Sequence, residues 1–275
     1  MSGKVLVTGA TGFVGRQVLR ALASRGVSTR VVIRDGTHAR LEAIQGMERV
    51  VTTQDLFAED RQWWAEVCDG IDIIIHTAWY AEPGNYRHSP KNMDCLLGTL
   101  QMGRGAVMAG VRRVVGLGTC LEYDTREGML TVESPLRPRT PYAGAKAAAY
   151  TALANWLPMQ GTEFAWCRIF YLYGEGEDGR RLVPYLHAKL AAGEPAELTS
   201  GIQIRDFLDV REAGDMIASI ALGTQQGAIN ICSGVPVTVR QLAWRIADEW
   251  GRRDLLRFNV RLDHASDPPC VVGVK

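Results

Sequence analysis

Three glycines follow an apolar run near the start of the chain, and their spacing constrains the fold more than any other feature. The run Val5-Leu6-Val7-Thr8 has the composition of a buried strand, and Gly9, Gly12 and Gly15 come directly after it. Apolar residues then recur at helical spacing as far as Leu22. Glycines in such a turn allow a tight bend, close approach of a bulky group and close packing of a helix on a sheet. Because the first amides of the helix would face an anion, the pattern predicts a site for a dinucleotide pyrophosphate; the alternative is a purely structural turn.

The first half of the chain alternates short apolar runs with amphipathic segments. The runs are rich in Val and Ile and predict buried strands at 5–8, 29–33, 49–52, 72–76 and 113–117. Helical spacing lies between them, near 13–25, 38–45, 59–68 and 91–109. Regular alternation of this kind predicts an α/β fold of the Rossmann type, with a doubly wound parallel sheet and right-handed crossovers.

The second half begins in the same rhythm and then loosens. A helix is predicted at 140–156, where Thr140 suits the N-cap and Pro141 the first helical position, and a strand follows at 164–170. Beyond that strand, short strands and turns separate helices near 181–192, 210–222 and 238–250. We therefore expect a dinucleotide-binding domain at 1–174 and a smaller α/β substrate lobe at 175–275, interleaved with it and packed against it, because no flexible linker separates them.

Composition excludes several classes of partner. The 275 residues include 31 Lys and Arg against 30 Asp and Glu, so no global field favours nucleic acid or an anionic membrane. No secretion signal opens the sequence and no uncharged apolar run is long enough to span a bilayer, so we expect no membrane association and a cytoplasmic location. The six cysteines are scattered without a Cys-x-x-Cys pair, which predicts reduced, mostly buried thiols and no metal site.

The end of the second predicted strand bears on the choice of nicotinamide cofactor. An acidic residue about 20 positions after the glycines usually holds the ribose 2′-hydroxyl of NAD. Here Arg34 takes that place and Asp35 follows. Since an arginine attracts a 2′-phosphate, we predict NADP; NAD is the alternative, with Arg34 in solvent and Asp35 on the ribose.

A phenol and an ammonium group lie four residues apart at Tyr142 and Lys146, on one face of the helix predicted at 140–156. A neighbouring ammonium favours phenolate and moves the phenol pKa toward neutrality, which suits a general acid or base. Such a pair also occurs by chance on exposed helices.

Together these segments resemble a known family. Thr8 to Gly15, Gly118 to Tyr123, and Tyr142-x-x-x-Lys146 follow in the order typical of the extended short-chain dehydrogenase/reductases, and in particular of the NAD-dependent epimerase/dehydratase family. The resemblance covers nearly the whole chain. It implies a Rossmann domain, a nicotinamide cofactor and a nucleotide-linked sugar as substrate.

The resemblance also implies roles for individual residues. Thr119 would orient the sugar oxygen, Tyr142 would pass a proton to or from it, and Lys146 would bind the nicotinamide ribose and lower the tyrosine pKa. Arg205 would bind the substrate diphosphate, with Arg181 as a weaker second candidate that could equally be a solvated arginine at a helix start. The full set expected to bind the cofactor is Gly9, Thr11, Gly12, Phe13, Val14, Gly15, Arg34, Asp55, Leu56, Thr77, Ala78, Tyr142 and Lys146. His76, at the end of a predicted strand, is interpreted as a buried structural residue.

Departures from the family pattern narrow the activity. Dehydratases of the family carry an Asp-Glu pair directly after the threonine, where this chain has Cys120 and Leu121. Without those carboxylates an elimination lacks its acid and base. The family's Asn after the sixth strand is Tyr171, and the usual Pro after Gly174 is Glu175, so substrate contacts there are not carried over.

Three functions fit these observations. The first is an NADP-dependent reductase acting on a keto group of a nucleotide-activated (deoxy)sugar, as in carbohydrate or surface-polysaccharide biosynthesis. The second is a C4 epimerase, which removes and returns a hydride without net reduction. The third is a cofactor-binding sensor without catalysis, which the intact Thr119, Tyr142 and Lys146 argue against. By resemblance we also expect a homodimer formed through the helices at 91–109 and 140–156.

Overall fold

A seven-stranded parallel sheet organises the larger part of the molecule. The computed structural model describes residues 3–41, 46–263 and 267–275. Within them the strand order is β11-β7-β5-β4-β1-β2-β3, and every neighbouring pair is parallel. The strands are β1 (Val5–Thr8), β2 (Thr29–Arg34), β3 (Met47–Thr53), β4 (Ile73–His76), β5 (Arg113–Thr119), β7 (Glu163–Ile169) and β11 (Gly227–Ile231). The order changes direction at β1 and β4, which is where nucleotides bind in doubly wound sheets.

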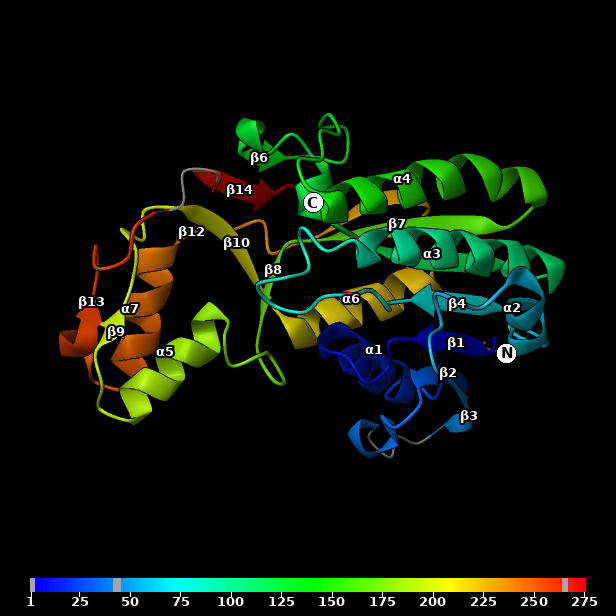
Figure 1. The fold of residues 1–275 in the computed structure, drawn as a ribbon, viewed down its shortest axis with the longest axis horizontal. Coiled ribbons are helices and arrows are strands. Elements are labelled where there is room, and N and C mark those ends of the chain that lie inside the picture. The colour runs from blue at the N-terminus through cyan, green and yellow to red at the C-terminus, as the bar shows by residue number, and fades with distance from the viewer. Residues whose placement is uncertain (1–2, 42–45, 264–266) are drawn as a thin grey trace.

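Helices cover both faces of this sheet, as Figure 1 shows. On one face α1 (Phe13–Ala23) and α6 (Val210–Leu222) bury an apolar core that includes Leu19, Leu22 and Ile217. The other face is covered by α2 (Arg61–Val67), α3 (Lys91–Met108) and α4 (Pro141–Trp156), whose core side chains are Trp64, Met102 and Leu153. Both faces are therefore buried, which explains why the strands are continuously apolar rather than alternating.

A smaller lobe lies beyond the carboxyl ends of the sheet strands, at the left of Figure 1. Its main sheet has the order β12-β10-β14-β6, with β8 paired to β10, and a separate pair joins β13 to β9. Helices α5 (Leu182–Ala191) and α7 (Val239–Glu249) pack together over an apolar core centred on Leu186 and Ala243. The strands are β6 (Met129–Leu130), β8 (Tyr171–Tyr173), β9 (Ala196–Glu197), β10 (Ile204–Asp209), β12 (Pro236–Thr238), β13 (Leu256–Arg257) and β14 (Cys270–Gly273).

The predicted α/β architecture and most predicted elements are confirmed. The helix predicted at 38–45 is an exception: His38–Arg40 form a single 3-10 turn and Leu41 has an extended backbone, while residues 42–45 lie outside the described residues. No residue of that turn is buried and no side chain caps it, so packing adds nothing to a short local pattern.

The chain crosses between the two lobes more than once. Helix α6 and strand β11 follow residue 174, yet they complete the large sheet and its helical cover. Strand β6 precedes residue 174, yet it pairs with β14 in the small sheet. A single cut at residue 174 therefore does not separate the two sheets, because strand pairing between distant segments decides which lobe each element joins.

Among the described residues, no helix is long and apolar enough to cross a membrane. The same residues include no group of three His, Cys, Asp or Glu side chains placed to hold a metal ion. All six cysteines lie in described segments as free thiols, and only Cys270 is not buried.

Candidate active site

The glycine turn after β1 has the geometry that the sequence predicts. Gly9 has φ +67°, and a Cβ there would lie 2.6 Å from Thr77 Oγ1. A Cβ on Gly15 would lie 2.2 Å from the carbonyl oxygen of Gly9, so α1 can start this close to the strand only with glycine at that position. Gly12 is the N-cap residue of α1 and provides no side-chain cap. The first amides of α1 are thus without a side-chain acceptor in a narrow turn, which suits a pyrophosphate group.

The cofactor-binding candidates outside the turn lie at the carboxyl ends of neighbouring strands. Arg34 ends β2 with an exposed side chain, and Asp35 beside it is also exposed. Asp55 follows β3, where its carboxylate accepts a hydrogen bond of 3.0 Å from the Phe57 amide. Leu56 is half-buried beside it. Parallel strands bring these residues to the same edge of the sheet as the glycine turn.

The loop after β4 packs against the same turn. Thr77 Oγ1 donates a 2.6 Å hydrogen bond to the carbonyl of Thr8, and the Ala78 amide donates to Thr8 Oγ1 at 3.3 Å. His76 is buried, with ring nitrogens 2.9 Å from Thr8 Oγ1 and 3.0 Å from Thr99 Oγ1. Burial lowers the pKa of His76 to about 3, and the charge on Lys146 lowers it further. The imidazole is therefore neutral and structural, in agreement with its interpretation from sequence.

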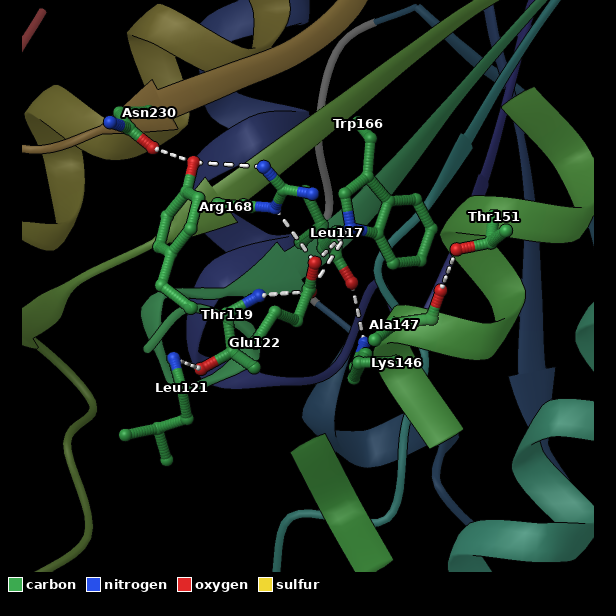
Figure 2. Close-up of polar contacts among 11 residues, drawn as sticks. Leu117, Thr119, Leu121, Glu122, Lys146, Ala147, Thr151, Trp166, Arg168 and Asn230 are labelled. Carbon is green, nitrogen blue, oxygen red and sulfur yellow. Dashed lines mark hydrogen bonds and ion pairs between the residues drawn. The ribbon is translucent and has the colours of Figure 1, made fainter. Parts of the chain in front are cut away.

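Helix α4 carries Tyr142 and Lys146 into the site. Thr140 caps the helix by accepting a hydrogen bond from the Ala143 amide, and Pro141 occupies the first turn, as predicted. Lys146 is 3% exposed, and its Nζ donates to the carbonyl of Leu117 at 2.5 Å (Figure 2). The same nitrogen lies 3.8 Å from the ring centroid of Trp79. Burial lowers the pKa of Lys146 to about 7, against the opposing charge of Glu122.

Tyr142 is surrounded by aromatic rings. Its ring stands edge-on to Tyr86, with centroids 4.8 Å apart, and to Trp79 at 6.4 Å. The Thr119 side chain lies near enough to the phenol to act on its pKa, in the lowering direction, so two of the predicted catalytic groups are neighbours. Desolvation nevertheless raises the pKa of Tyr142 well above its ordinary value, with a further contribution from Tyr86. The expectation of a phenol pKa near neutrality is therefore wrong, because desolvation and the neighbouring Tyr86 and Glu122 all raise the pKa and only the Thr119 side chain lowers it.

Trp79 and Tyr86, which the sequence analysis did not single out, belong to a segment that lies over α4. Asn92 is fully buried and holds this segment: its Oδ1 accepts from Trp79 Nε1 at 2.9 Å, and its Nδ2 donates to the Tyr86 carbonyl at 2.6 Å. The carbonyl of Arg87 accepts a 3.1 Å hydrogen bond from the Tyr142 amide. Aromatic residues after the strand at 72–76 were the available signal, but a loop has no periodicity that reveals where its side chains point.

Thr119 ends β5 and begins a 3-10 turn over Cys120–Glu122. The hydroxyl of Thr119 accepts from the Leu121 amide at 3.3 Å, and the Glu122 carboxylate accepts from the Thr119 amide at 2.8 Å. Cys120 is 3% exposed, and burial raises its thiol pKa to about 12. Neither Cys120 nor the apolar Leu121 can exchange protons with a substrate near neutral pH.

Cationic side chains gather on the substrate-lobe side of Tyr142. Arg205 on β10 is 3% exposed, with its Nη2 2.8 Å from the carboxylate of Asp267 and its guanidinium carbon 5.3 Å from the Tyr171 ring centroid. Arg181, the exposed N-cap residue of α5, lies 5.8 Å from the ring centroid of Tyr86. The two arginines predicted to bind phosphate thus reach the same region from different elements, and Arg205 already has a carboxylate partner.

Comparisons with known proteins agree with this geometry. The model of the NAD dependent epimerase/dehydratase family matches residues 5–232. The chain is 23% identical over 273 residues to a dTDP-6-deoxy-L-talose 4-dehydrogenase (NAD(+)) from Aggregatibacter actinomycetemcomitans, covering 98% of this chain and 99% of that protein.

Two solved structures share the fold across nearly the whole chain. A dTDP-glucose 4,6-dehydratase from Streptomyces venezuelae, with NAD bound, has a TM-score of 0.83 and 24% identity, covering 98% of this chain and 88% of the other. A UDP-N-acetylglucosamine 4-epimerase from Methanobrevibacter ruminantium has a TM-score of 0.84 and 20% identity, covering 100% and 90%.

Proposed function

The chain belongs to the NAD-dependent epimerase/dehydratase family, and from this premise we propose that it is a nicotinamide-dependent reductase acting on a keto group of a nucleotide-activated deoxysugar. The observation that carries the proposal is that β5 and α4 place Thr119, Tyr142 and the buried Lys146 at one site, where Lys146 donates to the carbonyl of Leu117. Positions 120 and 121 beside it are a buried thiol and a leucine. This set can transfer a proton to or from an oxygen, but it has no carboxylate pair at 120–121 for elimination. Reduction or its reverse fits the site better than dehydration.

The residues present fit a dinucleotide. The turn at Gly9, Gly12 and Gly15 would hold the pyrophosphate on the first amides of α1, and Thr77 and Ala78 line the strand edge beside it. Thr11, Phe13 and Val14 border the same turn, and Asp55 with Leu56 would face the adenine. When bound, the nicotinamide group supplies or accepts the hydride.

The chain's own residues would handle the proton and the orientation of the sugar. Thr119 would orient the reacting oxygen through its hydroxyl. Tyr142, whose raised pKa keeps the phenol protonated, would donate its proton to the oxygen during reduction. Lys146 would hold the cofactor ribose through its ammonium group. Trp79 and Tyr86 would exclude water from this point, which strengthens electrostatic interactions in the site.

We propose NADP as the preferred cofactor. Support comes from Arg34, whose guanidinium is exposed at the end of β2 and has no partner among the described residues. Asp35 is the competing feature because it would repel a 2′-phosphate. Asp35 therefore favours NAD, which is the cofactor in the name of the Aggregatibacter relative.

For the substrate, we propose a diphosphate-linked sugar whose phosphates lie near Arg205 and Arg181. Each arginine already has acidic neighbours, Asp267 beside Arg205 and both Glu177 and Asp178 near Arg181, so a diphosphate would compete with these carboxylates for the guanidinium groups. Relatives named as enzymes of dTDP-sugars and UDP-sugars support this substrate class. The Aggregatibacter protein supports the 4-position of a 6-deoxysugar as the reacting carbon.

The test is a stoichiometric assay. Wild-type protein is mixed with NADPH or NADH and with a dTDP-linked or UDP-linked 4-keto-6-deoxysugar, and the nicotinamide absorbance and the sugar product are followed together. A reductase consumes one reduced cofactor for each ketone. A C4 epimerase, the alternative supported by the Methanobrevibacter fold relative, would interconvert hydroxyl configurations of a nucleotide sugar without net absorbance change. Cofactor binding without either reaction would indicate a sensor.

We also propose a homodimer formed through α3 and α4. Apolar side chains remain exposed along α3, including Met93 at 55%, Leu97 at 58% and Met108 at 53%. Sedimentation of wild type against Leu97→Asp tests this interface, with the variant expected to be monomeric. The free, buried thiols support the predicted cytoplasmic location.

A further inference from the structure

A buried ion pair between Glu122 and Arg168 lies directly behind Thr119. The sequence analysis assigned no role to either residue. Glu122 and Arg168 are 0% and 1% exposed, and the carboxylate accepts a 2.7 Å hydrogen bond from Arg168 Nε. Trp166 Nε1 donates to the same carboxylate at 3.0 Å. Figure 2 shows this carboxylate between Thr119 and the side chains of Arg168 and Trp166, on the side of Thr119 away from Leu121.

The remaining acceptor contact of Glu122 is with the proposed active site itself. Its Oε1 accepts the 2.8 Å hydrogen bond from the Thr119 amide, so the carboxylate fixes the main chain of the residue proposed to orient the reacting oxygen. Space around the carboxylate is closed. A Cβ on Gly118 would lie 2.2 Å from Trp166 Nε1 and 2.5 Å from Glu122 Oε1, so the strand carries glycine where the side chains converge.

We propose that Glu122 is a positioning residue of the active site: held by Arg168, its carboxylate fixes the main chain of Thr119 and sets the electrostatic environment of Lys146. The expected effect of Glu122 on turnover rests on the proposed function, whereas its effect on Lys146 does not. The ion pair costs desolvation of two charges, and such pairs often contribute little net stability. A requirement of the neighbouring site explains its presence better than stability does.

Lys146 Nζ lies 5.8 Å from the ring centroid of Trp166, and Nε1 of that indole donates to Glu122, so one buried ring separates the ammonium group from the carboxylate. Glu122 is the group of opposite sign that acts most strongly on Lys146. Glu122 raises the Lys146 pKa against burial, and the thiol of Cys95 on α3 acts in the same direction more weakly. His76 on β4 is neutral, and Tyr142 lies one turn earlier on the same helix with a protonated phenol. Arg168 lies on β7 and donates to Oε2 of the carboxylate, whereas Oε1 accepts from the Thr119 amide.

The outer side of the ion pair provides a matched control. Arg168 Nη1 donates to the hydroxyl of Tyr123 at 2.9 Å, and that hydroxyl donates to Asn230 at 2.8 Å. Asn230 in turn binds the carbonyl of Leu130 in the small sheet. Tyr123→Phe therefore removes a buried link between the lobes without changing the carboxylate of Glu122.

The first test needs neither cofactor nor substrate. Lys146 has a pKa of about 7 in the folded protein, below its ordinary 10.5, so between these values the unfolded chain binds the extra proton and the free energy of unfolding rises with pH. The Lys146 contribution is the difference between the free energies of unfolding of proteins with lysine and with Lys146→Met, measured from about pH 5.5 to 8.5 so that the range spans the lower edge of that window.

Glu122→Gln alone would leave the Arg168 guanidinium buried without its counter-charge, which strongly destabilises a fold, so the charge test combines it with Arg168→Met. In this double variant we expect the rise to begin about one pH unit lower, the effect of losing a nearby opposite charge. Tyr123→Phe should leave the onset unchanged while lowering stability at every pH. An unchanged onset in the double variant, or an equal shift in Tyr123→Phe, would overturn the electrostatic part of the proposal.

The second test separates geometry from charge. Glu122→Asp keeps the negative charge but withdraws it by one methylene from the Thr119 amide. We expect the Lys146 onset to stay near its wild-type pH and kcat for the keto-sugar nucleotide to fall about tenfold with KM little changed, as for an interaction made in the transition state. Wild-type kcat in Glu122→Asp would refute the positioning of Thr119. Failure of the proposed reaction itself would appear in wild-type protein and leave the unfolding test intact.

Discussion

The ring of Tyr86 stands perpendicular to the ring of Tyr142, with centroids 4.8 Å apart and planes at 88°. Asn92 holds Tyr86 through its main-chain carbonyl, so the contact belongs to a buried hydrogen-bonded segment and not to a free surface loop. The proposed proton donor, which is half-buried, is therefore partly covered by a neighbour far from it in sequence, and desolvation raises the pKa of Tyr142.

Replacing Tyr142 by Phe should abolish most turnover while the fold remains. The variant loses the proton donor but keeps the ring that packs against Tyr86 and Trp79. We expect kcat to fall by roughly 10² to 10⁴, the range of one general acid or base, with cofactor affinity nearly unchanged. Steady-state kinetics and cofactor titration measure the two effects. Wild-type turnover in the variant would exclude both enzymatic functions and favour a sensor.

Arg34→Asp should change cofactor preference. If the guanidinium pairs with a 2′-phosphate, the variant should bind NADPH more weakly by about 1.5–3 kcal/mol, the scale of a charge-assisted hydrogen bond, and NADH should be little affected. Calorimetric titration of both cofactors checks this, with Arg40→Asp on the nearby 3-10 turn as a control for general surface charge. Equal weakening of both cofactors, or tighter binding of NADH by wild type, contradicts the NADP proposal.

Arg205→Ala should weaken substrate binding more than catalysis. A diphosphate held equally in the ground and transition states would make KM rise about tenfold or more with kcat nearly constant. Asp267→Asn is the matched variant, because it frees Arg205 from its present partner and should leave KM unchanged or lower it. If Arg205→Ala binds every tested nucleotide sugar as wild type does, the phosphates lie elsewhere.

Glu177 should make stability depend on pH near neutrality. Burial raises the pKa of Glu177 to about 7 from 4.5, at a cleft of about 580 Å³ between α5, α7 and the loop after β8. The folded protein therefore binds the extra proton between these values, so its free energy of unfolding falls as pH rises through that window. Glu177→Gln removes this dependence. Thermal unfolding at about pH 5 and pH 8 should show the variant gaining stability relative to wild type at the higher pH, and an equal difference at both would contradict the assignment.

Local patterns were sufficient for much of the fold. The helix at Pro141–Trp156 has its cap at Thr140, and the positive φ of Gly9 follows from a turn that only glycine makes without strain. The helix predicted at 38–45 fails because a short exposed segment has no core to pack against. Periodicity also did not reveal that β6, before residue 174, joins the small sheet, or that β11, after residue 174, joins the large one. Strand pairing is a long-range property that local spacing does not contain.

The sequence by itself determined the glycine turn after β1, the alternation of strands with helices, and the Tyr142 and Lys146 pair on one helical face, because each depends on residue spacing within short local segments. Tertiary structure alone decided the environment of that pair. Trp79 and Tyr86 cover it, while Glu122 is buried against Arg168 behind Thr119. Desolvation and charge at the site depend on what packs there from distant segments, so the pKa of Tyr142 could rise although its own helix predicts the opposite.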